Sequence, residues 1–103
     1  MTSNFRRILL KLSGESLGEP GQPISRNRLL YMAEEIRSIR GMGVEIAVVL
    51  GGGNIFRGST GATRGFSRVQ GDTIGMLATV INSFALSSVL EEIGVPSKLL
   101  TSV

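Results

Sequence analysis

The chain has 103 residues, of which 11 are Lys or Arg and 8 are Asp or Glu, and it contains no Cys, His or Trp. These absences exclude thiol nucleophiles, imidazole bases and Cys/His metal sites. A net charge of +3, with no block of like charges anywhere along the chain, gives little support to nucleic-acid binding.

The first half of the chain predicts a strand followed by a helix. Residues 7–12 form a short apolar run that ends at a glycine, which favours a buried strand. A loop rich in Pro and Gly follows over residues 18–23. Apolar residues at helical spacing then predict a helix that begins after an N-cap at Ser25 and ends at Gly41.

The second half predicts two strands that flank a long helix. Residues 44–50 are β-branched and almost continuously apolar, as in a central strand of a parallel sheet. Asp72 can cap a helix that we expect to end near Ile93, and residues 97–103 read as a third strand. Because strands and helices alternate, we expect an α/β fold with a parallel sheet. The long helix is apolar on nearly all faces, which indicates burial by further chain or by another subunit.

Nothing in the sequence predicts export or insertion into a membrane. The apolar run near the N-terminus is too short for a signal peptide. The longest uncharged stretch, residues 73–90, contains too many Gly, Ser, Thr and Asn residues for a span of about 20 apolar residues. We therefore expect no membrane partner and a cytoplasmic location, which the lack of Cys permits.

Glycine is the main clue to function, because 14 glycines are about twice the usual share of roughly 7%. Both predicted strands open into glycine, and the carboxyl ends of parallel strands form the ligand-binding edge of such a sheet. The run Gly51–Gly53 would let backbone N–H groups approach an anion, and Lys11 or Arg57 could add positive charge. A phosphate site is thus predicted, with a simple tight turn as the alternative.

The two common nucleotide-binding motifs do not fit. A Walker A motif would need lysine where Ser59 stands, and a dinucleotide motif would need glycine where Phe56 stands. Without His or Cys, the residues suit a reaction that depends on positioning and charge neutralisation, such as phosphoryl transfer. Asp72 and Glu15 are the acids beside the glycine-rich segments, with a plain helix cap and an exposed loop acid as their alternatives.

Three segments together resemble bacterial uridylate (UMP) kinases of the amino acid kinase family. They are residues 11–15 (KLSGE), 48–58 (VVLGGGNIFRG) and 68–82 (RVQGDTIGMLATVIN). The resemblance implies a three-layer α/β/α fold with a mainly parallel sheet, and transfer of the γ-phosphoryl of ATP to UMP, assisted by Mg²⁺, to give UDP for pyrimidine nucleotide synthesis. It also implies that residues 1–103 are the N-terminal, acceptor-binding part of an incomplete fold. The ATP-binding C-terminal part would lie outside them, and this piece alone would be inactive.

The resemblance also assigns residues to the site. Those matched to ATP contacts are Lys11, Leu12, Ser13, Gly14, Gly53 and Arg57, with Lys11 stabilising the charge of the transferred group, and those matched to UMP contacts are Gly52 and Asp72. No residue is assigned to a metal. The family implies a cytoplasmic hexamer with GTP as activator and UTP as inhibitor. Residues 18–25, however, end in Pro-Ile-Ser where the family has Gly-Ile-Asp, which leaves activation through this loop unsupported.

Two alternatives remain. A carbamate, acetylglutamate or aspartate kinase would share the fold and the glycine loops, although the GMLATV stretch at 75–80 favours the UMP branch. A non-catalytic nucleotide-binding or assembly module would keep the anion site without turnover.

Overall fold

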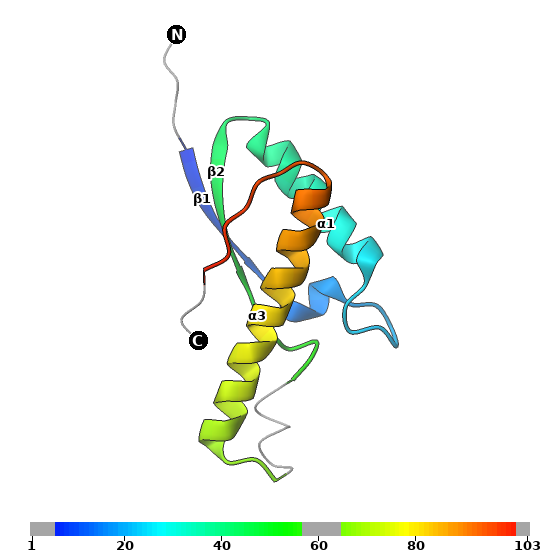
Figure 1. Cartoon of the computed structure of the whole chain (residues 1–103), viewed down its shortest axis with the longest axis vertical. Helices are drawn as coiled ribbons and strands as arrows, with labels where there is room; N and C mark the ends of the chain where they lie inside the picture. The colour runs from blue at the N-terminus through cyan, green and yellow to red at the C-terminus, as the bar shows by residue number, and fades with distance from the viewer. Residues whose placement is uncertain (1–5, 57–64, 101–103) are drawn as a thin grey trace.

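The computed structural model describes residues 6–56 and 65–100. In chain order its elements are strand β1 (Arg6–Leu12), 3₁₀ helix η1 (Gly14–Leu17), helix α1 (Arg26–Arg40), strand β2 (Val44–Leu50) and helix α3 (Arg68–Glu92), as Figure 1 shows. β1 and β2 pair in parallel along their whole length, with Ile8 opposite Ile46 and Leu12 opposite Leu50. This arrangement confirms the predicted parallel α/β class.

The sheet has one covered and one open face. Along β2 the side chains alternate, so that Ile46, Val48 and Leu50 point into the protein. Val49 on the other face is 49% exposed, and Leu9 on β1 is 62% exposed. Helices α1 and α3 both pack on the covered face. The described residues therefore build the sheet and one helical layer of the expected three-layer fold.

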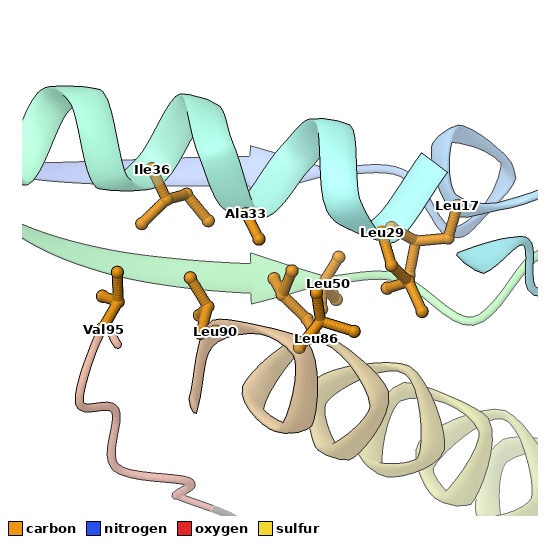
Figure 2. Close-up of a cluster of buried hydrophobic side chains, with 9 residues drawn as sticks. Leu17, Leu29, Ala33, Ile36, Leu50, Leu86, Leu90 and Val95 are labelled. Atoms are coloured by element: carbon orange, nitrogen blue, oxygen red, sulfur yellow. The ribbon is translucent and has the colours of Figure 1, made fainter. Parts of the chain in front are cut away.

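One hydrophobic cluster lies between the two helices and β2 (Figure 2). Its buried members are Leu17, Leu29, Ala33, Ile36, Leu50, Leu86, Val89, Leu90 and Val95. The α1 members recur at the predicted helical spacing. The N-cap prediction is also confirmed, because the Ser25 hydroxyl accepts a hydrogen bond from the Arg28 N–H at 3.3 Å.

The predicted start of the long helix is wrong. α3 begins after Ser67, whose hydroxyl accepts from the Gln70 N–H at 3.1 Å, while the Gln70 side chain accepts from the Ser67 N–H at 3.0 Å. This capping box satisfies two N–H groups of the first turn, so the helix begins a turn earlier than expected. Asp72 consequently lies in the second turn and is not the N-cap.

The predicted third strand is not formed over residues 97–100, and residues 101–103 lie outside the described part of the chain. Val95 is buried in the core, and the Ser97 hydroxyl lies 2.6 Å from that of Ser87 on α3. These contacts hold the segment against α3. The segment lines a groove of about 520 Å³ together with β2 and α3, and residues 97–100 do not pair with β2.

Within the described residues α3 is long and apolar enough to cross a membrane, judged by length and composition alone. The core helix of a soluble protein meets the same criterion. One side of α3 packs on β2 and α1, and it includes the fully buried polar side chain of Asn82. In this structure α3 contributes to the core through that one side.

Candidate functional site

The loops that follow the two strands lie in contact, as the sequence predicted. The Gly51 N–H donates to the Leu12 carbonyl oxygen at 3.0 Å. A Cβ atom added to Gly14 would lie 2.8 Å from the Gly53 nitrogen and 2.9 Å from the Gly51 oxygen. Only glycine allows so close an approach of two backbones. The parallel pairing of β1 with β2 thus brings both glycine segments to one edge of the sheet.

The middle glycine of the run packs against α3. A Cβ atom on Gly52 would lie 2.7 Å from the Ala78 Cβ atom and 3.0 Å from the Gly75 carbonyl oxygen. Glycine is therefore required at position 52 by the close approach of loop and helix. Packing against α3, which neither the phosphate prediction nor the tight-turn alternative included, thus accounts for part of the glycine pattern.

The same loop also presents unpaired hydrogen-bond donors. Within the described part of the chain, the backbone N–H groups of Gly52, Gly53 and Asn54 donate to no other group, and all three residues are half-buried. The next two N–H groups, of Ile55 and Phe56, both donate to the Gly52 carbonyl oxygen at 3.0 Å. Successive N–H groups without partners form the kind of concave backbone surface that binds an anion. We name residues 51–54 the anion loop.

Two asparagine side chains, neither of which has a role predicted from the sequence, hold the anion loop. The Asn82 amide donates to the Asn54 Oδ1 at 2.7 Å and to the Gly51 carbonyl oxygen at 2.8 Å. The Asn54 amide donates to the Asn82 Oδ1 at 3.0 Å and to the Pro23 carbonyl oxygen at 2.8 Å. Asn82 stands midway between the buried residues Ala78 and Leu86, so its place on the core side of an apolar helix was the signal that could have revealed it.

Glu15 also belongs to this edge of the sheet. Its Oε2 atom would lie 2.9 Å from a Cβ atom added to Gly53, so the carboxylate rests against the anion loop. Glu15 is exposed, as the alternative of an exposed loop acid expected, but it lies beside the site and not away from it.

Lys11, Leu12 and Ser13 lead directly into this edge. Lys11 is exposed near the end of β1, opposite Val49, and its place in the strand puts its side chain on the open face of the sheet. Leu12 faces the core, and Ser13 is exposed between β1 and η1. The structure thus brings residues 11–14 to the anion loop. The Lys11 side chain, the only positively charged one among these four, lies on the open face of the sheet.

Asp72 is exposed on α3. It lies three residues, or about one helical turn, before Gly75, whose carbonyl oxygen meets Gly52. Asp72 therefore lies about one turn of α3 before the residues that Gly52 contacts. Arg57, the remaining predicted site residue, lies outside the described residues.

No protein-held metal site is built by the residues that the structure describes. They contain no group of three or more His, Cys, Asp or Glu side chains that could bind a metal ion. Glu15 is the carboxylate that lies against the anion loop. One carboxylate cannot by itself form an all-protein cage for Mg²⁺. Mg²⁺ commonly binds through one or two carboxylates together with substrate phosphates.

The fold is that of an α/β protein whose parallel strands end at one edge, and the anion loop lies at that edge, where sheets of this kind bind ligands. The family model of the amino acid kinase family matches residues 6–103, and the chain belongs to this family.

Curated relatives and solved structures agree with this assignment. The chain is 59% identical over 100 residues to a uridylate kinase of Porphyromonas gingivalis, a match that covers 96% of this chain and 42% of the relative. It is 57% identical over 102 residues to a uridylate kinase of Bacteroides thetaiotaomicron, covering 98% of this chain and 43% of the relative. The chain thus spans less than half the length of these relatives.

Two solved structures share the fold. The UMP kinase of Ureaplasma parvum superposes with a TM-score of 0.90 at 33% identity, over 98% of this chain and 44% of that one. The UMP kinase of Bacillus anthracis superposes with a TM-score of 0.79 at 44% identity, over 87% of this chain and 37% of that one. These matches confirm the amino acid kinase fold and the resemblance found in the sequence.

Proposed function

We propose that the protein containing this chain is a UMP kinase, which transfers the γ-phosphoryl group of ATP to UMP and yields UDP and ADP. The observation that carries the choice of substrate is the 59% identity to a uridylate kinase across both strand-end loops and α3. The N–H groups of the anion loop, which have no partner among the described residues, support the phosphate chemistry independently of that identity. Residues 1–103 would supply the acceptor-binding side of the site.

Phosphoryl transfer needs alignment and neutralisation of charge more than covalent help from the protein. The N–H groups of Gly52, Gly53 and Asn54 would donate to phosphate oxygens at the edge of the sheet. Lys11 would stabilise the negative charge of the transferred group as a point charge. Asp72 would hold UMP beside Gly52, and Leu12–Gly14, Gly53 and Arg57 would contact ATP. Mg²⁺ would enter with the ATP phosphates, because the described residues do not fit a metal cage of their own.

The outer side of α3 supports self-association. Leu77, Ile81 and Phe84 are 44%, 49% and 63% exposed, and they recur at helical spacing on the side that faces away from the core. An apolar face of this kind fits a second copy of the chain or further chain of the same protein. A hexamer, a cytoplasmic location and regulation by GTP and UTP remain predictions.

The proposal is tested by assaying the full-length protein for ADP formation with UMP, N-acetylglutamate, carbamate or aspartate as acceptor. Of the four acceptors, we expect only UMP to support ADP formation. Lys11→Met should lower kcat by about 10²-fold to 10³-fold, as for loss of one preorganised charge contact. Turnover with another acceptor would favour a different family member. UMP binding without turnover would favour the non-catalytic module.

A further inference from the structure

The two asparagines at the anion loop join parts of the chain that are distant in sequence. Asn82 comes from the middle of α3, Asn54 from the loop after β2, and their other acceptors are Gly51 and Pro23. We name Asn54 and Asn82 the asparagine clasp. Their amides donate to each other reciprocally, at 2.7 and 3.0 Å, so the clasp closes through two hydrogen bonds between side chains.

The orientation of both amides is fixed by their surroundings. Each NH₂ group has two hydrogens and two acceptors within 3.0 Å, so all four amide hydrogens are used. Rotating the Asn82 amide by half a turn would set its oxygen against the Gly51 carbonyl oxygen and lose both donations. Because Asn82 is fully buried, no solvent is available to replace a lost partner.

The clasp acts on the backbone of the anion loop directly. One bond holds the Gly51 carbonyl oxygen toward α3, immediately before the three N–H groups that have no partner in the described part of the chain. A Cβ atom on Gly14 would lie 2.4 Å from the Asn54 Oδ1, so the loop after β1 also packs on the clasp. The clasp therefore fixes both strand-end loops relative to α3.

We propose that Asn54 and Asn82 are positioning residues that hold the N–H groups of Gly52, Gly53 and Asn54 in the arrangement that binds phosphate. This inference rests on the proposed function, because phosphoryl transfer to UMP is the reaction that the positioned N–H groups would serve. Neither side chain needs to touch a nucleotide for this role. Displacement of a phosphate-binding group by about 1 Å can lower catalysis by roughly 10²-fold, which sets the expected effect.

The test compares Asn82→Leu, Asn54→Ala and the double variant with Val89→Ala in the full-length protein. Leucine has the same branched set of four side-chain heavy atoms as asparagine, although its methyl groups are bulkier, and it makes no hydrogen bond. Val89 is buried on α3 at 3% exposure and belongs to the core cluster, so its truncation reports general loss of stability. The readouts are kcat/KM for UMP, the thermal midpoint, and amide hydrogen exchange at Ile55 and Phe56, whose N–H groups bond to Gly52.

We expect each clasp variant to lower kcat/KM by about 10²-fold and to speed exchange at Ile55 and Phe56, with the double variant no worse than either single one. Val89→Ala should lower the thermal midpoint and leave both other readouts nearly unchanged. If Asn82→Leu does not fold, the Asn54→Ala variant tests the proposal, because Asn54 is only half-buried.

Effects that multiply in the double variant would overturn the proposal, as would activity lost only in proportion to the thermal midpoint. A wild-type protein without UMP turnover would refute the proposed function instead. The clasp would then be judged by exchange at Ile55 and Phe56, which is measured without substrate.

Discussion

Replacing Gly52 by alanine adds one methyl group at the point where the anion loop touches α3. The new carbon would lie 2.7 Å from the Ala78 Cβ atom, whereas carbon atoms pack best at about 3.5–4.0 Å. It would also lie 3.0 Å from the Gly75 oxygen and 3.1 Å from the Thr79 nitrogen, which are backbone atoms that cannot rotate away. The loop must therefore move off the helix. Overpacking of this kind costs about 1–3 kcal/mol.

The assay is urea unfolding of the full-length protein, together with kcat/KM for UMP. Gly75→Ala is the matched control, because Gly75 lies within the same helix contact but an added Cβ atom there meets nothing within 4 Å. Alanine is the better helix former by about 1 kcal/mol, so this variant should be more stable than the wild type. Gly52→Ala should lose both stability and activity. The steric reasoning is refuted if Gly52→Ala unfolds at the wild-type urea concentration, or if the two variants change stability in the same direction.

Three further predictions concern the scaffold around the site. Leu86→Ala should cost about 2–5 kcal/mol in urea unfolding, because Leu86 is 3% exposed at the centre of the core cluster, and a loss below that range would show that the core repacks. Ser67→Ala should cost about 1 kcal/mol and speed amide exchange in the first turn of α3 only; faster exchange along the whole helix would contradict a local capping role. The hydrogen bond from Arg26 holds the pKa of Glu92 below its ordinary value of 4.5. Because this carboxylate has the lower pKa when folded, the ion pair stabilises the protein above pH 4.5 and is lost as pH falls through the lowered pKa. Glu92→Gln should therefore be less stable than the wild type at neutral pH and equal to it in acid, which unfolding curves at the two pH values would check.

Local signals predicted the elements whose ends are set by neighbouring residues. β2 has the predicted bounds because its β-branched run ends directly in glycine. α1 begins after Ser25 because that hydroxyl caps the first turn from within the same segment. The helix containing Asp72 was placed too late because two competing caps were available, and the Ser67 box satisfies more backbone groups than a single Asp side chain would.

Elements that need a distant partner were not predictable in the same way. Residues 97–100 have the composition of a strand, but a strand exists only where it pairs, and here Val95 and Ser97 hold the segment against α3. The role of Asn82 likewise depends on acceptors more than twenty residues away along the chain.

The sequence by itself determined the parallel α/β class, the two strands, the glycine segments at their ends and the resemblance to uridylate kinases. These follow from hydrophobic periodicity, caps and motifs, which are properties of short stretches of chain. Only the tertiary structure decided why Gly52 must be glycine, which N–H groups lack a partner among residues 6–56 and 65–100, and that Asn54 and Asn82 hold the anion loop. Those features arise from close contact between β2, its loop and α3, and the distances across such a contact are fixed only when the elements pack.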